Sequence, residues 1–323
     1  HNTVLGDALG GTRRWHYATE DEAFLDVLRL SEGMTYKAAA ADLPMGGAKS
    51  VILLDRDAQP GTEAEARAMG RFVNTFGGTY IAAEDVGVNE QFCDWMGEET
   101  RYVMGGVTVS RGGDPSPYTS LGCFNAMKAC LAHSGRPVDF SGLTVAIQGL
   151  GATGSKLARL LVDHGATVVG TDVNEAAVAR TVEDLGIGVI PHDQDLFSTE
   201  CDIFAPCALG AVLNTTTIPA LRCPIVCGTS NNVLEDPARD GAALQSAGVL
   251  YAPDFVANAG GLIRLAGLYL GMTEQQLDDK VARIESTTLE VLKTGTDMAS
   301  MHDAAVAYAL TRIDAGRRSP SDR

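Results

Sequence analysis

The spacing of apolar residues predicts helices and short strands in the first part of the chain. Thr19 and Glu22 form a capping box ahead of apolar residues that recur at helical spacing, so we expect a helix that runs to about residue 41. Residues 63–76 repeat that spacing and end at two glycines, which commonly stop a helix. Short apolar runs predict two strands, at residues 51–54 and 80–83.

The second part of the chain alternates regularly between strand and helix. Residues 112–117 are rich in glycine and proline and predict a linker, which a helix over residues 120–133 follows. The alternating segments that come next lie at residues 143–149, 155–164, 167–172, 175–185, 203–205, 225–228 and 249–252. Strands that alternate with helices form βαβ units and a parallel sheet, so this part predicts an α/β fold. Beyond residue 258 the pattern is helical to the end.

Composition and charge narrow the class of protein. The 323 residues are 45% hydrophobic and 20% charged, which is typical of a globular enzyme large enough for two domains. A net charge of −16 argues against a nucleic-acid partner, because a basic surface is needed to offset phosphate repulsion. The sequence contains no run of 18 apolar residues, so we expect no membrane-spanning helix. The seven cysteines lack disulfide-like or metal-like spacing, so we expect reduced thiols, a cytoplasmic location and no metal site.

A glycine-rich turn predicts a dinucleotide site in the alternating region. Gly149, Gly151 and Gly154 stand between a predicted strand and a predicted helix, where they permit a tight turn, the approach of a pyrophosphate and close helix–strand packing. The helix N-terminus offers free N–H groups to the phosphates. Asp172 ends the next strand, where a carboxylate accepts from a ribose hydroxyl and repels a 2′-phosphate, so we predict NAD rather than NADP. The alternative is a Rossmann-like domain that binds another nucleotide or none.

Two lysines and an aspartate are candidates for the chemistry. Lys49 follows a run of small, uncharged residues, where burial of the ammonium group would lower its pKa. Lys37 lies on the first predicted helix, and Asp85 directly follows a predicted strand. By composition alone all three would be ordinary solvated or capping residues. Gly10 and Gly11 form either a bare turn or a pair of backbone N–H donors for an anionic ligand.

Short motifs are spread in order along nearly the whole chain. They are ALGGTR at residues 8–13, GMTYK at 33–37, LPMGGAK at 43–49, AEDVG at 83–87, GLGATG at 149–154, FAPCA at 204–208, NN at 231–232 and YAPDFVANAGG at 251–261. This set resembles the leucine/valine/phenylalanine dehydrogenases of the glutamate dehydrogenase superfamily. The resemblance implies reversible oxidative deamination of an L-amino acid to a 2-oxo acid and ammonia, with NAD accepting the hydride.

The resemblance implies a separate role for each of the three charged residues. Lys37 would hold the substrate carboxylate. Lys49 would polarise the carbonyl group and activate the attacking water, and Asp85 would exchange protons with the amino group and ammonia. A lysine of near-neutral pKa and an ionised carboxylate suit these proton transfers, whereas Lys37 must stay charged to pair with a carboxylate.

The same resemblance implies the positions that complete the site. The backbone of Gly10 and Gly11 and the side chain of Asn231 would assist in holding the substrate carboxylate. Asn258 would position the nicotinamide or the substrate. The implied cofactor-binding positions are Gly149, Gly151, Ala152, Thr153, Gly154, Asp172, Val173, Cys207, Ala208 and Asn231.

Leu9 bears on the side chain of the substrate. In glutamate-specific relatives a lysine precedes the first Gly-Gly, and with Leu9 at this position an acidic side chain would find no partner. The resemblance places Ala83, Leu262 and Leu265 in the same pocket, and all are apolar. The bulk of Leu262 favours a branched aliphatic substrate such as leucine or valine, and because one methylene is worth only about 1–3 kcal/mol, several can turn over. L-Phenylalanine is the alternative substrate.

Pattern and resemblance together predict two α/β domains with a cleft between them. Residues 1–117 and 287–323 would form a substrate and oligomerisation domain, and residues 118–286 a doubly wound Rossmann-type NAD domain. The chain begins at His1 inside an ordered motif, so we expect this first domain to lack its N-terminal residues. Relatives assemble through the substrate domain, which implies a homo-oligomer. The alternatives are a catalytically weak NAD-binding relative and a hydroxy-acid or malic-type dehydrogenase, which would need a different base.

The chain departs from the family pattern at Ala48, at Thr229 and Ser230, and over residues 88–93, which follow Asp85. Ala48 replaces a usual glycine; if that position needs a positive φ, alanine is strained and displaces Lys49. Thr229 and Ser230 stand where small apolar residues are usual, beside the expected nicotinamide. These changes predict altered specificity or slow turnover on common amino acids.

Overall fold

The computed structural model describes residues 1–55, 60–191 and 196–318. The chain forms two compact units. Unit 1 is His1–Pro115, Leu262–Leu277 and Ala309–Arg323, and unit 2 is Ser116–Gly261 and Asp278–Tyr308. The predicted substrate and NAD domains, with boundaries near residues 117 and 287 and a cleft between them, stay a prediction. Residues 319–323 of the predicted substrate domain lie outside the described residues.

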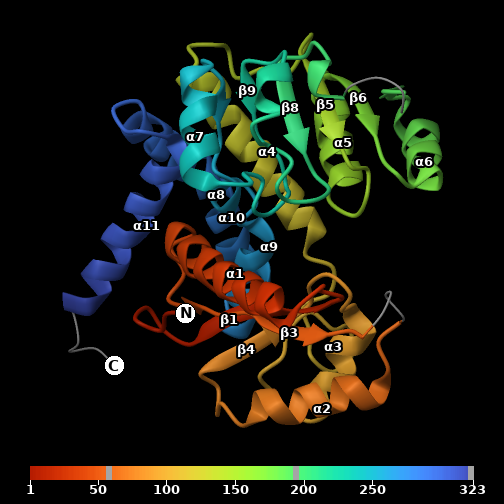
Figure 1. Cartoon of the computed structure of the whole chain (residues 1–323), viewed down its shortest axis with the longest axis vertical. Helices are drawn as coiled ribbons and strands as arrows, with labels where there is room; N and C mark the ends of the chain where they lie inside the picture. Colours follow the sequence, from red (N-terminus) through yellow and green to blue (C-terminus); the bar gives the residue numbers. More distant parts are fainter. Residues whose placement is uncertain (56–59, 192–195, 319–323) are drawn as a thin grey trace. The chain divides into compact units, whose positions relative to one another are not determined.

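Unit 1 contains a parallel sheet built around strand β1. Among the described residues the sheet has four strands, β1 (Ala8–Trp15), β2 (Gly46–Gly47), β3 (Ser50–Leu53) and β4 (Tyr80–Ala83). Each of the other three strands pairs with β1 in parallel. Helix α1 (Glu20–Ala40) covers one face of this sheet, and α2 (Glu63–Asn74) and α3 (Glu90–Gly97) lie on the other (Figure 1). Parallel strands emerge at the same edge, so the segments that follow β2 and β4 come together there.

The helices of unit 1 begin where their capping residues lie. At the start of α1, Thr19 accepts a hydrogen bond from the backbone N–H of Glu22, which is one half of the predicted capping box; Glu22 itself accepts from the backbone N–H of Ala18 instead of from that of Thr19. At the start of α2, Thr62 and Glu65 form a full capping box. These local signals explain why the sequence located both helices to within a few residues.

Strand β1 itself was not predicted. Gly10 and Gly11 lie inside it and pair with β4, so of the two alternatives for these glycines the bare turn does not hold. A side chain at Gly10 would overlap the carbonyl oxygen of Ala48, and one at Gly11 would overlap that of Glu84. The glycines therefore let the segments on both sides of β1 approach closely. The motif lacks the alternation of apolar and polar residues that marks a strand, which is why the sequence pattern missed it.

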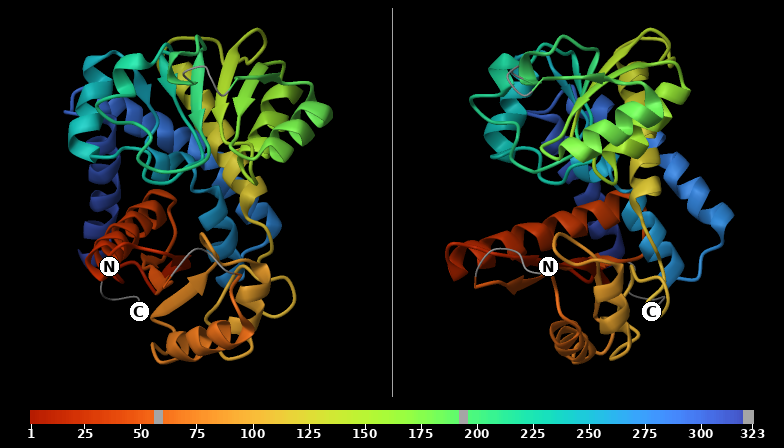
Figure 2. Two further views of the ribbon diagram at one scale, coloured as in Figure 1. Left: turned by 45° about the vertical axis from the view of Figure 1, so that its right-hand side comes forward. Right: turned by 90° about the vertical axis from the view of Figure 1, so that its right-hand side faces the viewer.

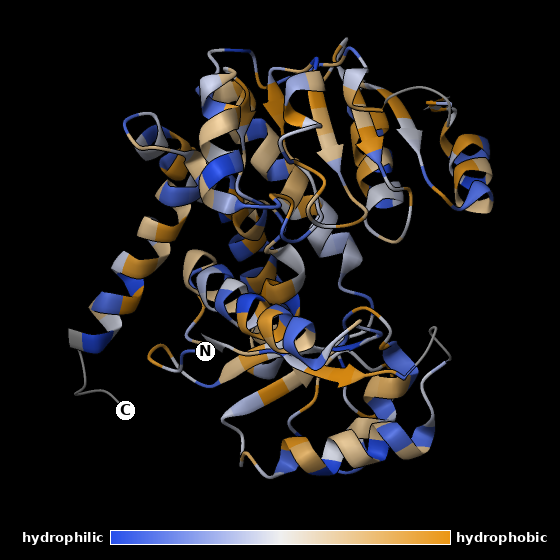
Figure 3. Cartoon of the chain, in the orientation of Figure 1, coloured by the Kyte–Doolittle hydropathy of each residue, from blue (hydrophilic) through white to orange (hydrophobic). Residues whose placement is uncertain are grey.

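Unit 2 contains a parallel sheet with the strand order β10-β9-β8-β5-β6-β7. Its six strands, counted over the described residues, are β5 (Thr144–Gln148), β6 (Thr167–Thr171), β7 (Gly188–Val189), β8 (Ile203–Pro206), β9 (Ile225–Val226) and β10 (Leu250–Tyr251). Most of β5 and β9 is coloured as hydrophobic in Figure 3, as expected for strands buried on both faces. This is the order of a doubly wound dinucleotide-binding sheet, whose direction switches between β5 and β8. The predicted fold class is confirmed.

Helices pack along this sheet (Figure 2). Helix α5 lies against β5 and β6, α6 against β7, and α7 against β10. The bounds of the later helices are α4 (Ser116–His133), α5 (Gly154–Asp163), α6 (Glu175–Leu185), α7 (Pro237–Ser246), α8 (Asp254–Ala257), α9 (Gly260–Tyr269), α10 (Glu274–Gly295) and α11 (Met301–Arg318). In the part of the chain that the structure describes, none of the helices combines the length and apolar character that crossing a membrane requires.

Candidate active site

Lys49 and Asp85 form an ion pair in unit 1. Lys49 follows β2 and Asp85 follows β4, and both strands pair with β1, so the two side chains meet at one edge of the sheet. The Nζ atom of Lys49 lies 3.0 Å from Oδ1 of Asp85, and the two side chains are only 6% and 12% exposed. The fold therefore brings together two of the residues that the sequence singled out.

Arg13 extends this ion pair in a way that the sequence did not predict. Its Nε atom donates to Oδ2 of Asp85 at 2.8 Å, and its Nη1 atom donates to Oδ2 of Asp26 at 3.0 Å. Tyr17 donates its hydroxyl hydrogen to the same oxygen of Asp26. Arg13 lies two residues after Gly11 and so faces the same side of the sheet, but this follows only once residues 8–15 are known to form a strand.

Burial and charge act in opposite directions on the Lys49–Asp85 pair. Burial lowers the pKa of the Lys49 amine and outweighs the opposing effect of Asp85, so this pKa lies below its ordinary value. Burial alone would raise the pKa of Asp85, but the positive charges of Lys49 and Arg13 hold it below its ordinary value. The pair thus combines an amine that can lose its proton with a carboxylate that stays ionised, which suits proton transfer.

Ala48 is not strained in this structure. The non-glycine residues with positive φ among the described residues are Asp42, Arg111, Ala211 and Asn232. Since Ala48 does not take a positive φ, replacing the usual glycine there does not displace Lys49 by backbone strain. Its carbonyl group instead packs against the backbone of Gly10.

Lys37 lies in the last turn of α1 and is buried, with 9% of its surface exposed. Two residues earlier in the same helix, the hydroxyl of Thr35 donates to the backbone oxygen of Gly47 in β2. The helix that carries Lys37 is thereby held against the segment that leads to Lys49. Its role in holding a carboxylate stays a prediction.

The residues expected to meet the substrate side chain are all buried apolar residues of unit 1. Leu9 lies in β1 and Ala83 ends β4. Leu262 and Leu265 lie on α9, three positions apart, and so share one face of that helix. The structure therefore supplies hydrophobic surface at each of these positions.

In unit 2 the glycine turn has the geometry that a dinucleotide requires. Gly149 has a φ of 96°, which only glycine adopts readily. A side chain at Gly154 would overlap the carbonyl oxygen of Gly149 and crowd Cys207, whereas one at Gly151 would meet no heavy atom within 4 Å. Ala208 also packs against Gly149. The turn is therefore closely packed around Gly149 and Gly154 but open at Gly151, three residues before α5 begins at Gly154.

Asp172 connects the glycine turn to the end of β6. Its Oδ2 atom accepts from the backbone N–H of Leu150 at 2.7 Å, and its Oδ1 atom accepts from that of Asn174 at 2.8 Å. Val173, the next residue, is 96% exposed. The carboxylate is thus fixed beside the turn by backbone hydrogen bonds.

Asn258 organises the segment that carries Asn231. Its Nδ2 atom donates to the backbone oxygens of Thr229 and Ser230 at 3.2 and 3.0 Å and to Oδ1 of Asn231 at 2.9 Å. The Thr229 hydroxyl lies 2.7 Å from that of Thr153 in the glycine turn. Asn258, Asn231 and the glycine turn therefore belong to one hydrogen-bonded set, and the polar Thr229 has a partner that an apolar residue would lack.

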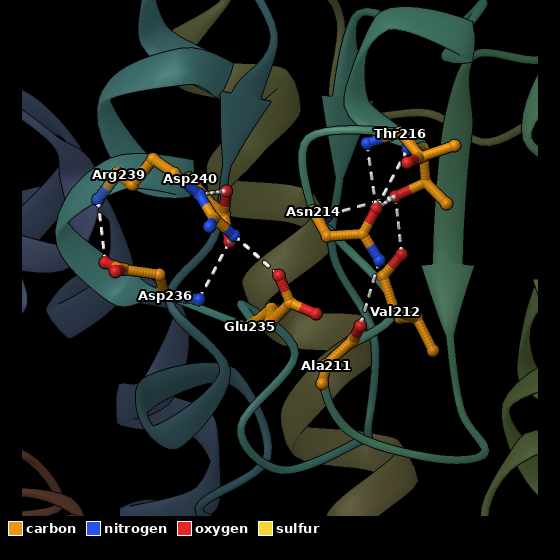
Figure 4. Close-up of polar contacts among 9 residues, drawn as sticks. Ala211, Val212, Asn214, Thr216, Glu235, Asp236, Arg239 and Asp240 are labelled. Carbon is orange, nitrogen blue, oxygen red and sulfur yellow. Dashed lines mark hydrogen bonds and ion pairs between the residues drawn. The ribbon is translucent and has the colours of Figure 1, made fainter.

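The loops that flank Asn231 are tied down by polar contacts (Figure 4). Asn214 accepts from the backbone of Thr216 and donates to the backbone oxygen of Ala211. On the other side, Asp236 caps α7 by accepting from the backbone of Arg239. The two loops join through hydrogen bonds such as that from the backbone N–H of Ala211 to the oxygen of Asn232. These contacts hold the backbone next to Asn231, whose side chain also accepts from Asn258.

Comparison with known proteins assigns the family. Residues 1–102 match the model described as Glu/Leu/Phe/Val dehydrogenase, dimerisation domain. Residues 113–187 and 174–318 match the model described as Glutamate/Leucine/Phenylalanine/Valine dehydrogenase. The chain belongs to this dehydrogenase family.

Individual relatives of this dehydrogenase are similar over most of their length. A leucine dehydrogenase from Thermoactinomyces intermedius is 42% identical over 323 residues, which cover 99% of this chain and 87% of that protein. A phenylalanine dehydrogenase from Lysinibacillus sphaericus is 41% identical over 298 residues, 90% of this chain and 77% of that protein. The crystal structure of L-tryptophan dehydrogenase from Nostoc punctiforme superposes with a TM-score of 0.83 at 38% identity and covers 99% of this chain and 92% of that one.

These comparisons confirm the predicted family and the predicted class of enzyme. The chain is an oxidoreductase of the amino-acid dehydrogenase family, and the family implies a nicotinamide cofactor. The glycine turn and Asp172 fit such a group. Within the described residues, histidine, cysteine, aspartate and glutamate side chains form no group of three placed to hold a metal ion.

Proposed function

We propose that this dehydrogenase catalyses the reversible oxidative deamination of apolar L-amino acids, with branched aliphatic substrates such as leucine and valine preferred. The observation that carries the proposal is the buried pair of Lys49 and Asp85, in which the pKa of the amine is lowered beside a carboxylate that stays ionised. The likeness to a leucine dehydrogenase supports the aliphatic preference. The phenylalanine dehydrogenase of similar identity keeps L-phenylalanine as the second candidate substrate.

Each charged residue has a task that suits its surroundings. The nicotinamide cofactor, when bound, accepts a hydride from the α-carbon of the substrate. Loss of that hydride leaves an imine at the α-carbon, and Lys49, with its lowered pKa, removes a proton from the water that adds to it. The C–N bond of the resulting carbinolamine then breaks, which releases ammonia and leaves the 2-oxo acid. Asp85 takes up and returns the proton of the amino group, and Lys37 binds the substrate carboxylate through its charge.

The buried apolar positions set the class of substrate. Leu9 and Ala83 leave no cation for an acidic side chain, whose burial without a partner is costly. Leu262 and Leu265 present branched apolar surface. We therefore expect leucine, valine and isoleucine to turn over faster than glutamate.

NADH formation at alkaline pH with a panel of L-amino acids tests the proposal. Leucine, valine, isoleucine, phenylalanine, tryptophan and glutamate are compared under the same conditions, each with and without enzyme. Highest kcat/KM for an aliphatic member supports the proposal, and highest kcat/KM for phenylalanine supports the second candidate. Measurable NAD binding without turnover of any member would mean a catalytically weak NAD-binding relative.

We propose NAD as the preferred cofactor because of Asp172. A carboxylate fixed at the end of β6 accepts from a ribose 2′-hydroxyl and repels a 2′-phosphate. Asp172→Ser should raise the ratio of kcat/KM with NADP to that with NAD by about 10- to 100-fold, which corresponds to the loss of one hydrogen bond to a charged group. Steady-state kinetics with both cofactors measure this ratio. Asp184→Ser, on the exposed side of α6, serves as the control, and an unchanged ratio in Asp172→Ser contradicts the assignment.

We propose that the protein is a homo-oligomer located in the cytoplasm. Residues 1–102 match a model described as a dimerisation domain, which supports assembly. All seven cysteines are free thiols, which supports a reducing compartment. Light scattering of the purified chain should give a mass of at least two chains, and a mass of one chain over the tested concentrations would rule out stable assembly.

A further inference from the structure

Arg13 lies between two carboxylates in unit 1, those of Asp85 and Asp26. We propose that Arg13, balanced by Asp26, is a positioning residue that holds one oxygen of Asp85 and thereby allows Lys49 to act as a base. The inference deepens the proposed function and rests on it. Arg13 itself is not expected to touch the substrate.

The geometry divides the two oxygens of Asp85 between two cations. Oδ1 faces Nζ of Lys49 at 3.0 Å, and Oδ2 accepts from Nε of Arg13 at 2.8 Å. The guanidinium group is planar and uses a second nitrogen for Asp26, so it has little freedom to turn. The carboxylate of Asp85 is therefore fixed in one orientation before any substrate arrives.

The charges explain why Arg13 matters for a neutral lysine. With Lys49 protonated, the set of Lys49, Asp85, Arg13 and Asp26 carries two positive and two negative charges. Loss of the Lys49 proton leaves Arg13 as the cation of this set, facing both carboxylates. Without Arg13, deprotonation of Lys49 would leave Asp85 and Asp26 with no cation beside them, so Lys49 would keep its proton to a higher pH. Arg13 thus stabilises the deprotonated form of Lys49.

Several elements contribute charge around this set. Arg13 comes from β1, Asp26 from α1 and Asp85 from the segment after β4. Glu20 and Asp21 of α1 line a cavity of about 680 Å³ that Lys49 also lines. Burial and the charge of nearby carboxylates, including Asp85, raise the pKa of Glu84 to about 7. Burial also raises the pKa of Tyr80, and the charge of Asp85 adds to this effect. Because Glu84 titrates in the relevant range, Glu84→Gln is needed to identify its share of any pH profile.

Two substitutions should move the pH profile in opposite directions. Arg13→Gln removes a positive charge, which raises the pKa of both Lys49 and Asp85, so the profile of kcat/KM for deamination should move to higher pH by roughly one unit or more. Asp26→Asn removes a negative charge, which lowers the pKa of Lys49, so its profile should move to lower pH by a smaller amount. Arg13→Lys keeps the charge and should restore part of the shift.

Arg14 provides a matched control on the same strand. It points to the opposite face of β1 and pairs with Glu65, and its side chain is 6% exposed, compared with 20% for that of Arg13. Arg14→Gln should affect stability without moving the pH profile. An equal shift in Arg14→Gln would assign the effect to general damage of the sheet and overturn the proposal.

A second measurement separates this inference from the proposed function. The Lys49 side chain is only 6% exposed, so its pKa is followed without turnover by NMR titration of protein labelled with carbon-13 at lysine Cε, with Lys49→Arg identifying the signal. A higher pKa in Arg13→Gln and a lower one in Asp26→Asn support the inference even if no amino acid is oxidised. An unchanged pKa, or shifts of the same sign, overturn it even if deamination is confirmed. If Arg13→Gln does not fold, Arg13→Lys and Asp26→Asn decide.

Discussion

Replacing Lys49 by alanine should lower kcat for deamination by about 10³-fold or more, because the proposed mechanism assigns Lys49 as the base that activates water. The affinity for NAD should stay unchanged, since the glycine turn and Asp172 lie in unit 2 whereas Lys49 lies in unit 1. Asp85 keeps Arg13 as its partner, so the substitution does not leave a buried carboxylate unpaired.

Stopped-flow and steady-state kinetics measure the loss of rate in Lys49→Ala, and titration calorimetry measures NAD affinity. Lys293→Ala removes an exposed lysine of α10 and should behave as the parent protein. A rate within tenfold of the parent would assign the base to another residue. A parallel loss of NAD affinity would indicate misfolding rather than loss of a catalytic group.

Asp85→Asn should lower kcat by about 10²- to 10⁴-fold, the usual contribution of a positioned acid or base. The amide keeps the size of the side chain but cannot take up a proton. It also removes the charge that raises the pKa of Lys49, so this pKa should fall further below its ordinary value. The acid limb of the remaining activity should therefore move to lower pH, in contrast to the shift expected for Arg13→Gln.

The pH dependence of kcat/KM in Asp85→Asn measures both effects. Asp163→Asn changes an exposed carboxylate near the end of α5 and serves as the control. A near-normal rate in Asp85→Asn would show that ammonia and the amino group exchange protons with another group. An unaltered pH profile at reduced rate would show that Asp85 does not govern the titration of Lys49.

Local signals in the sequence located most of the elements. The capping residues Thr19 and Thr62 mark helix starts that depend only on neighbouring backbone groups. The glycine turn between β5 and α5 likewise depends on adjacent residues, so its form follows from spacing alone. Strand β1 was missed because its pairing depends on segments far along the chain, whose close approach its glycines permit.

In the candidate site, too, the sequence marked some residues and missed others. Lys37, Lys49 and Asp85 stood out because they lie in short motifs that resemble a dehydrogenase family. Arg13 lies in one of those motifs, but no role was predicted for it, and Asp26 lies in none of the motifs. Ala48 was suspected of strain, which the backbone of the folded chain does not show.

The sequence by itself determined the α/β class, the dinucleotide turn and the family, because each rests on patterns within a few residues or on motifs that relatives share. Only the tertiary structure decided how the charges are joined. Arg13 and Asp85 are 72 residues apart in the chain, and they meet because β1 and β4 pair in parallel. Electrostatic effects on a pKa depend on distance in space and on burial, so the set of Lys49, Asp85, Arg13 and Asp26 exists as a chemical unit only in the folded protein.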